Sequence, residues 1–322
     1  MITMTEIAKL TGVSQPTVSR VLNGNPTVDP GIRERVLACA KAHDYQPNAL
    51  AKGLQGSRTH LLGVLVTDIS NSFYADLTKK IEAEARKAGC SILLFNSDSD
   101  PRNEREYLDV ARRYRVDGVL AVPTQETSAQ WSGYAKKLDI PVVAVARRVE
   151  RIDCVYVDHI QAGAMAAEYL AERGFERFLF IGQDCDGKYI GFRQAMDVKG
   201  LGAKTINTAY EDDGQLRQIL RSWFRAGWGR AAVFAGSDIC ALRVQDALRE
   251  LGLSVPGNVG VIGFGDTSVC RYLNPRLSSV SQPIVQMARE AVARLLDRIE
   301  HPGERGSLNL PLQASLVVRE ST

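Results

Sequence analysis

The sequence TEIAKLTGVSQPTVSRVLNG, residues 5–24, places two apolar patterns of helical spacing on either side of one glycine. Ile7, Ala8 and Leu10 form the apolar face of a first short helix. Gly12 supplies the tight turn that reverses the chain, because glycine adopts a left-handed backbone at no steric cost. The stretch therefore predicts two short helices joined by a tight turn.

The second helix is predicted to begin after Ser14, a good N-cap residue, and it tolerates Pro16 in its first turn. Val18, Val21 and Leu22 recur at the spacing of an inward-facing stripe. The side chains left facing outwards are Gln15, Pro16, Thr17, Ser19, Arg20 and Asn23. Such a face suits the major groove of DNA, where amides pair with adenine and guanidinium groups pair with guanine.

A third helix is predicted to begin at Pro30, with Asp29 as its N-cap. Its inward-facing positions are Ile32, Val36, Leu37 and Ala40. Three helices then enclose one small core, as in a helix-turn-helix domain. Polar outward faces also occur on small helical domains of other kinds, so the alternative at this point is a domain that does not bind DNA.

The segment that follows makes the pattern more specific. YQPNALAKGL at residues 45–54, together with GVS at 12–14, TVSRVLNG at 17–24 and DISN at 68–71, resembles the lactose/galactose repressor (LacI/GalR) family of bacterial transcription regulators, and the resemblance covers nearly the whole chain. It implies a dimer in which each subunit places a recognition helix in the major groove. It also implies paired hinge helices in the minor groove, where Leu54 of each subunit wedges between base pairs and kinks the duplex.

The resemblance divides the chain into a helix-turn-helix headpiece at 1–45, a hinge helix and linker at 46–58, and an effector-binding and dimerisation domain at 59–322. Gly53 and Gly56 weaken the hinge helix, so we expect it to fold only on DNA; an ordinary linker with a buried leucine is the alternative. The predicted DNA-binding residues are Thr3, Ser14, Gln15, Pro16, Thr17, Ser19, Arg20, Asn23, Tyr45, Asn48, Lys52 and Leu54.

The net positive charge of the chain lies in its first 60 residues. The chain has 40 basic and 37 acidic residues; seven and four of these lie in residues 1–60, which leaves 33 of each sign in residues 61–322. Because so small an excess attracts phosphates weakly, we expect a homodimer that doubles the contacts with a near-palindromic site on double-stranded operator DNA.

Cysteine spacing and hydropathy indicate a cytoplasmic protein without a metal or cofactor. The six cysteines are scattered, with no C-x-x-C pair and no histidines at metal-binding spacing, which is typical of a reducing compartment. The amino terminus leads directly into the first helix rather than into a signal peptide. No apolar run approaches the length of about 18 residues that a membrane span requires.

From residue 61 onward, short apolar runs alternate with amphipathic helical patterns. The predicted strands are 61–66, 91–95, 118–122, 142–145, 178–181, 231–235 and 259–264. The predicted helices are 73–88, 102–115, about 128–138, 161–173, 189–198, 214–226 and 238–251. This alternation predicts two open, doubly wound parallel α/β sheets with a cleft between them.

The resemblance implies a two-lobed periplasmic-binding-protein-like fold in which the chain crosses between the lobes three times. We place the crossings near His159, near residues 282–283 and near residues 303–305, so that a helix at 284–299 returns to lobe 1 and a final strand at 310–318 ends in lobe 2. Lobe 1 is then about 59–159 with 283–303, and lobe 2 is about 160–282 with 304–322. No leucine heptads follow, which favours a dimer over a tetramer.

Ligands of open α/β sheets bind beyond the carboxyl ends of the strands. The predicted effector-binding residues there are Asp68, Asn71, Phe73, Tyr74, Asn96, Thr124, Arg147, Asp158, Lys188, Ser237, Asp238 and Asp266. Phe73 or Tyr74 can stack on a sugar face while polar groups fix its hydroxyls. Alternatively, Asp158 and Asp238 cap the helices that follow them, and Phe73 staples the start of a helix.

The predicted pocket departs from the resembled family at several positions. Ala146 and Gly265 stand where members often carry an aspartate, whereas Arg147, Arg148 and Lys188 supply positive charge. Loss of carboxylates beside retained cations favours an anionic carbohydrate-type effector, such as a sugar acid or a sugar phosphate. Loss of the effector response is the other possibility.

These features together predict a transcriptional repressor whose operator affinity is controlled by the effector. The effector would shift the population between lobe arrangements and so change the spacing of the hinge segments; it either releases or promotes DNA binding. The alternative is a two-lobed sugar-binding protein or an enzyme on the same fold. The sequence lacks a P-loop, a glycine-rich dinucleotide motif and a G-x-S-x-G elbow, so we expect no enzymatic activity.

The predicted hinge leucine can be tested by the Leu54→Ala substitution. Without the intercalating side chain, we expect weaker operator binding in a mobility-shift titration, with unchanged effector affinity in calorimetry. Operator affinity equal to that of the parent protein would rule out the intercalating wedge.

Overall fold

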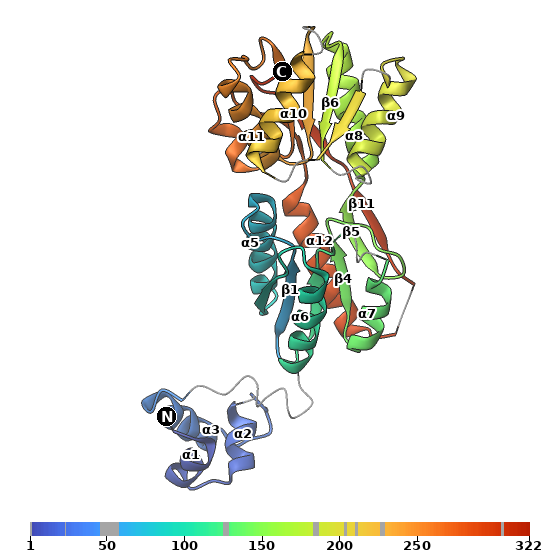
Figure 1. Ribbon diagram of the computed structural model, residues 1–322. Coiled ribbons are helices and arrows are strands. Elements are labelled where there is room, and N and C mark those ends of the chain that lie inside the picture. Colours follow the sequence, from blue (N-terminus) through green and yellow to red (C-terminus); the bar gives the residue numbers. More distant parts are fainter. Residues whose placement is uncertain are drawn as a thin grey trace. The chain divides into compact units, whose positions relative to one another are not determined.

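The computed structural model describes residues 2–22, 24–45, 58–124, 129–182, 187–202, 205–209, 212–225, 229–303 and 306–322. The chain forms two compact units, residues 1–59 and residues 60–322 (Figure 1). We refer to them as the helical unit and the α/β unit and describe each separately. Within the described residues, no helix is long and apolar enough to span a membrane.

The described residues of the helical unit form three helices, α1 (Met4–Thr11), α2 (Gln15–Leu22) and α3 (Pro30–Ala42). Thr3 caps α1, and Gly12 ends it with φ +68°, the left-handed conformation that the predicted turn requires. The Asp29 side chain accepts hydrogen bonds from the first turn of α3. All three predicted helices are therefore present.

Two leucines that were predicted to face the core of this unit are instead exposed. The exposed fractions of Leu10 and Leu37 are 62% and 45%. Thr11 is buried in place of Leu10, and its hydroxyl donates a hydrogen bond of 2.7 Å to the carbonyl oxygen of Ile7. The remaining core is small, with Val18 and Val36 fully buried at its centre.

The first sheet of the α/β unit has the strand order β11-β5-β4-β3-β1-β2, and every adjacent pair is parallel. Its strands are β1 (Leu61–Val66), β2 (Ser91–Asn96), β3 (Gly118–Ala121), β4 (Val142–Val145), β5 (Asp153–Val157) and β11 (Asn309–Leu312). The accompanying helices are α5 (Ser72–Lys87), α6 (Pro101–Arg113), α7 (Trp131–Leu138) and α12 (Ile284–Glu300). This sheet and its helices form lobe 1.

The second sheet has the order β12-β10-β9-β8-β6-β7, in which only β12 runs antiparallel to its neighbour. Its strands are β6 (Arg177–Ile181), β7 (Thr205–Thr208), β8 (Ala231–Ala235), β9 (Val259–Gly265), β10 (Ser278–Ser281) and β12 (Ser315–Val317). The accompanying helices are α8 (His159–Glu172), α9 (Gly187–Val198), α10 (Asp213–Arg225), α11 (Asp238–Glu250) and the 3-10 turn η2 (Ser268–Arg271). Together they form lobe 2.

Alternate residues of each strand face helices on opposite sides of the sheet. In lobe 1, Leu62 and Val64 of β1 pack with α5 and α12, whereas Leu65 packs with α6 and α7. In lobe 2, Phe178 and Phe180 of β6 face α8 and α9, while the other face of the sheet packs on α10 and α11 (Figure 1). Both lobes are therefore doubly wound, as predicted.

The chain crosses between the lobes at residues 158, 282–283 and 313–314. The first two crossings agree with the sequence prediction, but the third does not lie near residues 303–305. The predicted final strand is in fact two short strands, of which β11 pairs with β5 in lobe 1 and β12 pairs with β10 in lobe 2. Consequently residues 306–312 belong to lobe 1, not to lobe 2.

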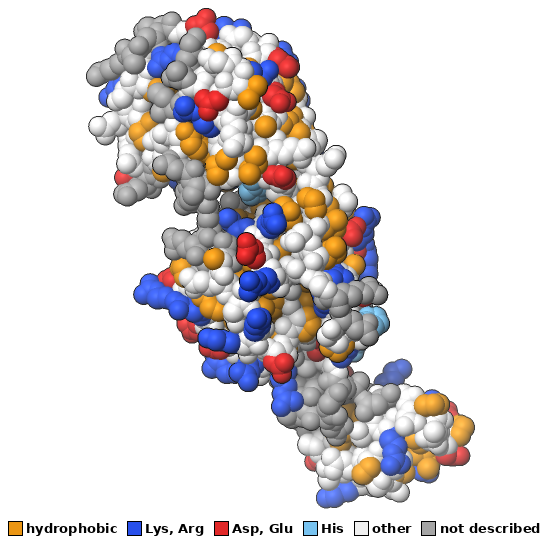
Figure 2. All heavy atoms as spheres, turned by 90° about the vertical axis from the view of Figure 1, so that its right-hand side faces the viewer, with side chains coloured by type: hydrophobic (Ala, Val, Ile, Leu, Met, Phe, Trp, Pro, Cys, Tyr) orange, Lys and Arg blue, Asp and Glu red, His pale blue; other side chains and the backbone are white. Residues whose placement is uncertain are grey.

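Charged side chains of both signs cover the α/β unit. Figure 2 shows Lys and Arg side chains together with Asp and Glu side chains on the face that it draws.

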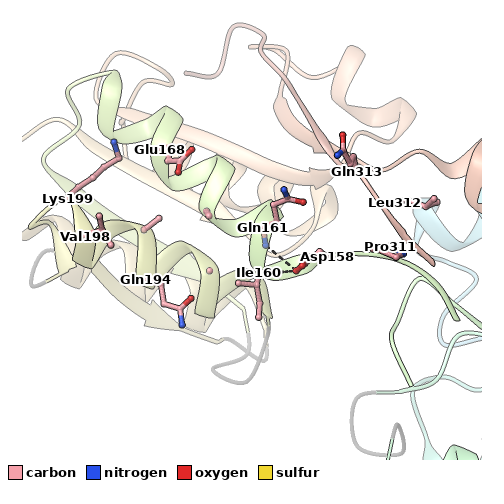
Figure 3. A pocket seen from close by; sticks show the side chains of 13 residues that line it. Asp158, Ile160, Gln161, Glu168, Gln194, Val198, Lys199, Pro311, Leu312 and Gln313 are labelled. Atoms are coloured by element: carbon pink, nitrogen blue, oxygen red, sulfur yellow. Dashed lines mark hydrogen bonds between the residues drawn. The ribbon is translucent and has the colours of Figure 1, made fainter. Parts of the chain in front are cut away.

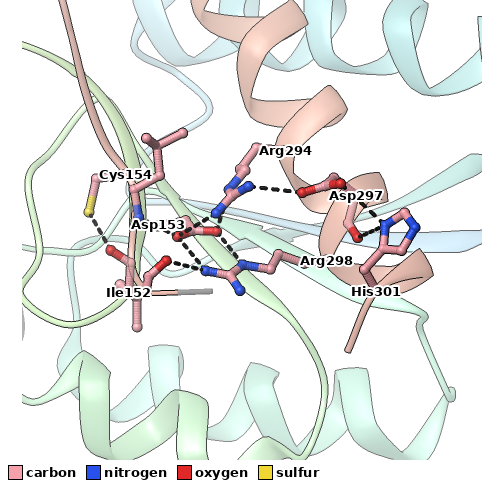
Figure 4. Close-up of polar contacts among 9 residues, drawn as sticks. Ile152, Asp153, Cys154, Arg294, Asp297, Arg298 and His301 are labelled. Carbon is pink, nitrogen blue, oxygen red and sulfur yellow. Dashed lines mark hydrogen bonds and ion pairs between the residues drawn. The ribbon is translucent and has the colours of Figure 1, made fainter. Parts of the chain in front are cut away.

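A buried ion-pair cluster holds the last strand of lobe 1 in place (Figure 4). The carboxylate of Asp153, at the start of β5, accepts hydrogen bonds from Arg294 Nε at 2.6 Å and from Arg298 Nε at 2.7 Å, both on α12. The backbone N–H of Leu308 donates a third bond to it, at 2.7 Å. Arg298 also donates to the carbonyl oxygen of Gly306, so the cluster joins β5, α12 and the segment that leads into β11.

Burial by itself would raise the pKa of Asp153, but hydrogen bonds from Arg298, from the Leu308 N–H and from Arg294 outweigh it, so the pKa lies below its usual value. A depressed carboxylate pKa means that the folded protein binds its proton less readily than the unfolded chain does. The stabilisation is therefore present at neutral pH and is lost as the pH falls below about 4.

Replacing Asp153 by Asn should lower the free energy of unfolding by about 3–5 kcal/mol, because two largely buried guanidinium groups lose their counter-ion. Asp297→Asn is a matched control, since Asp297 pairs with Arg294 from a position that is 39% exposed, and should cost about 1 kcal/mol or less. Urea unfolding of both full-length variants at pH 7 measures the difference. Equal losses would show that the cluster does not stabilise the fold as described.

Candidate functional site

The exposed face of α2 carries the residues that were predicted to reach DNA bases. Gln15, Pro16 and Arg20 are exposed, and Thr17 and Ser19 are half-buried. The helix is oriented by its opposite side, which is buried in the core of the helical unit. A guanidinium and an amide therefore project from one rigid surface, as major-groove recognition requires.

Three further predicted DNA-binding residues have structural contacts of their own. The Thr3 hydroxyl and the Glu6 carboxylate form a capping box on α1, and the hydrogen bonds from Thr3 lower the pKa of Glu6. Ser14 accepts a bond from the Thr17 N–H at the start of α2. Tyr45 packs against the core of the unit. The other four predicted residues lie outside the described residues: Asn23, Asn48, Lys52 and Leu54.

In the α/β unit, a cleft of about 100 Å³ lies between the lobes. Its walls come from the first turns of four helices and from the carboxyl ends of strands, which is where open α/β sheets bind ligands. The lining residues are Asn71, Ser72, Phe73, Tyr74, Val122, Ala146, Arg147, His159, Lys188, Gly236, Ser237, Asp238, Ile239, Phe264, Thr267 and Gln282.

Seven of the predicted effector-binding residues meet in this cleft: Asn71, Phe73, Tyr74, Arg147, Lys188, Ser237 and Asp238. Asn71 also caps α5 by accepting a bond of 3.1 Å from the Phe73 N–H. The rings of Phe73 and Tyr74 meet edge to face at 5.2 Å. Ser72, His159 and Gln282 also line the cleft but were not predicted to bind the effector. The sequence contained a signal for each of them: Ser72 is next to Asn71, His159 is next to Asp158, and Gln282 lies at the second crossing.

Five other predicted residues line no part of the cleft because local or distant partners hold them elsewhere. Asp68 accepts from the Ser70 N–H, and Asn96 accepts from the Ile69 N–H. The backbone N–H of Thr124 donates to Glu104, a buried carboxylate on α6. The remaining two are Asp158 and Asp266, of which Asp266 pairs with Arg319 at 2.6 Å.

Asp158 lies instead beside a second, open hollow on lobe 2 (Figure 3). This hollow measures about 750 Å³ and runs along α8 and α9 to the end of β11 and the start of the third crossing, at Pro311–Gln313. The Asp158 carboxylate accepts bonds from the Ile160 and Gln161 N–H groups, so the residue caps α8. Of the two roles considered for Asp158, effector binding and helix capping, the structure shows helix capping.

Asp238 lines the cleft, but its carboxylate is bound by lobe 2 itself. It accepts bonds from the Thr267 N–H at 2.7 Å, from the Thr267 hydroxyl at 2.9 Å and from the Ser279 hydroxyl at 2.6 Å. Burial and then the nearby Asp238 carboxylate raise the pKa of Cys270 to about 12. The N-cap of α11 is Ser237, not Asp238. The single acidic side chain of the described cleft wall is thus already satisfied.

Several polar atoms of the cleft wall have no hydrogen-bond partner within the part of the chain that the structure describes. They are the Arg147 Nε, the Ser72 hydroxyl and the side-chain oxygen of Gln282. Lys188, in contrast, donates to the carbonyl oxygen of Gly236 at 2.8 Å and lies 4.6 Å above the Phe264 ring. Buried polar atoms normally have partners, so these three are available to a ligand.

Close packing of α8 against α9 fixes the position of Lys188. A Cβ atom at Gly191 would come within 1.8 Å of the Ile160 carbonyl oxygen, and one at Gly163 would come within 2.0 Å of the Lys188 carbonyl oxygen. Only glycine fits at either contact, so the backbones of the two helices touch directly. The first turn of α9 is thereby held at the edge of the cleft.

Comparison with known proteins identifies the family. The family described as "Bacterial regulatory proteins, lacI family" matches residues 3–48, and "Periplasmic binding protein-like domain" matches residues 167–322. The catabolite control protein A of Priestia megaterium is 31% identical over 332 residues, covering 100% of this chain and 99% of that protein. The chain belongs to the lacI family. A further relative, the ribose operon repressor of Escherichia coli (strain K12), is 30% identical over 94% of both chains.

Solved structures of lacI-family proteins have the same architecture. A complex of the transcriptional regulator CelR with cellobiose is 27% identical, covers 100% of both chains and has a TM-score of 0.71. The lac repressor dimer bound to operator has a TM-score of 0.85 at 21% identity, with 99% and 98% coverage. The lacI-family relatives are transcription regulators and repressors, so this chain is a DNA-binding transcription regulator and not an enzyme.

The α8–α9 contact can be tested by Gly191→Ala. Because the added methyl group overlaps the Ile160 backbone, we expect a loss of about 1–3 kcal/mol in the free energy of unfolding. Gly133→Ala is the matched control: it lies in α7 with nothing within 4 Å of the added Cβ, and it should raise stability by up to about 1 kcal/mol. Urea unfolding of both full-length variants checks this, and a neutral Gly191→Ala would contradict the close contact.

Proposed function

We propose that this regulator represses transcription as a homodimer that binds a near-palindromic operator, and that a small carbohydrate-type molecule bound between the lobes controls its DNA affinity. The observation that carries the proposal is the interlobe cleft, with unpartnered polar atoms in its wall, in the same chain as an exposed recognition helix. A protein that binds operator DNA acts in the cytoplasm, where bacterial DNA lies.

On the DNA side, α2 supplies the base contacts and the hinge segment 46–58 supplies minor-groove contacts. Arg20 is exposed in the last turn of α2, and a bidentate guanidinium–guanine pair is the commonest specific contact in the major groove. Two copies are required because the excess positive charge of one subunit is small. The lac repressor dimer bound to operator is a precedent within the family.

On the ligand side, printed descriptions of relatives support a carbohydrate. CelR was solved with cellobiose, and a LacI family regulator from Enterococcus faecium, 26% identical with a TM-score of 0.72, was solved with ribose. The cleft of this chain combines aromatic walls, Phe73 and Tyr74, with polar groups, which suits a sugar-like molecule.

Ligand binding would act through the relative populations of two lobe arrangements. The cleft wall includes residues from both lobes, such as Arg147 of lobe 1 and Lys188 of lobe 2, so a bound molecule contacts both. A ligand that binds one arrangement better shifts the population toward it by its differential affinity. The three crossings that connect the lobes are the segments that must accommodate this change.

The proposal is tested by selecting binding sites from a random duplex pool with the full-length protein. We expect a near-palindromic consensus. Arg20→Ala should relax the base preference at one position of each half-site by about 1–3 kcal/mol, whereas Lys52→Ala should weaken binding to all sequences and lower its salt dependence. Failure to enrich any symmetric sequence would overturn the proposed function.

A further inference from the structure

We propose that the molecule bound in the cleft is a compact hydroxylated anion, a sugar acid or sugar phosphate, whose charged group binds Arg147 and one of whose hydroxyls donates to Gln282. This inference rests on the proposed function, in which the cleft is the effector site. It adds the chemical class of the ligand and the residues that select it.

Arg147 provides the principal observation. It lies two residues after the end of β4, where the carboxyl edge of the first sheet meets the cleft. Its side chain is half-buried, and its Nε atom is buried without a hydrogen-bond partner in the described structure. A guanidinium is a rigid fork of donors with no acceptor, so a carboxylate or phosphate is the group that satisfies it best.

The surroundings of Arg147 also favour negative charge. The first turns of α5, α8, α9 and α11 all contribute residues to the cleft wall, and the N-terminal end of a helix attracts anions. Lys188 adds a second positive charge. Asp238 carries the opposite charge, but its carboxylate is bound by three hydrogen bonds from lobe 2.

Gln282 shows that charge alone does not satisfy the cleft. This residue is only 7% exposed, lines the cleft and has a side-chain oxygen with no donor among the described residues. A fully ionised carboxylate or phosphate has no proton to donate to this oxygen, whereas a ligand hydroxyl can donate to it. The unpartnered Ser72 hydroxyl can donate or accept. The ligand therefore carries both an anionic group and at least one hydroxyl.

The size of the cleft indicates a compact ligand. Its volume of about 100 Å³ is well below the roughly 300–1,000 Å³ of pockets that hold drug-sized ligands. Its apolar wall consists of Phe73, Tyr74, Val122 and Phe264. These limits favour a single sugar unit over an oligosaccharide.

The test uses full-length protein and sets of sugars that differ in one group: glucose with gluconate and glucose 6-phosphate, and ribose with ribonate and ribose 5-phosphate. Calorimetry measures the dissociation constants. We expect at least one acid or phosphate to bind about 10-fold or more tightly than its neutral parent, because hydrogen bonds to charged groups are the stronger ones. A neutral sugar that binds as tightly as its charged derivatives, or a panel with no charged binder, would overturn the inference.

Two variants assign the selectivity to Arg147. Arg147→Gln should weaken binding of the charged ligand about 10-fold or more, and Arg148→Gln, the exposed neighbour that does not line the cleft, should leave it within about twofold. Because no described group pairs with Arg147, the unliganded Arg147→Gln protein should unfold at or above the parent temperature. A lower unfolding temperature, or unchanged affinity for the charged ligand, would contradict a ligand-binding role.

Operator binding by the same preparations separates the two proposals. If the parent protein binds its selected operator but prefers neutral sugars, only the ligand class is wrong. If it binds no operator at all, the proposed function fails, whatever the cleft binds.

Discussion

The direction of the strands determines where this protein can bind a ligand. Every adjacent pair in the first sheet is parallel, and β12 alone reverses direction in the second. Parallel strands all end at the same edge of the sheet, and the chain must return to the opposite edge before the next strand begins. The helices that make this return therefore all begin at the carboxyl edge. As a result, four helix N-termini and the polar residues beside them meet in the interlobe cleft.

The third crossing depends on interactions that are distant in sequence. Asp153 is separated by more than 140 residues from the two arginines that bind it, and it also holds the N–H of Leu308. These contacts keep β11 in the first sheet, so the crossing follows β11 instead of preceding it. Without knowledge of these partners, an aspartate at the start of DCVYV reads as part of a loop, and the strand β5 was accordingly not predicted.

The same reasoning explains which parts of the fold and the site could be predicted. Strands with continuous apolar runs, such as AAVFA at 231–235, and helices with clear caps were predicted correctly. The polar strands TINT at 205–208 and SSVS at 278–281 were missed, because only pairing with buried neighbours identifies them as strands. Likewise, proximity to a strand end correctly placed seven predicted residues in the cleft. Thr124 and Asp266 do not line it, because they are bound to Glu104 and Arg319, partners that are distant in sequence.

The charge of the cleft is set by very few side chains, and the fold does not depend on one of them, Arg147. Asp238 is held by Thr267 and Ser279 and contributes to the structure of lobe 2, whereas Arg147 follows β4 and is bound by nothing described in either lobe. An acidic or neutral residue at position 147 could therefore occupy the same place without repacking either core. Ligand class in this architecture can change by substitution at a strand end while the cleft geometry, and with it the route from ligand to crossings, is retained.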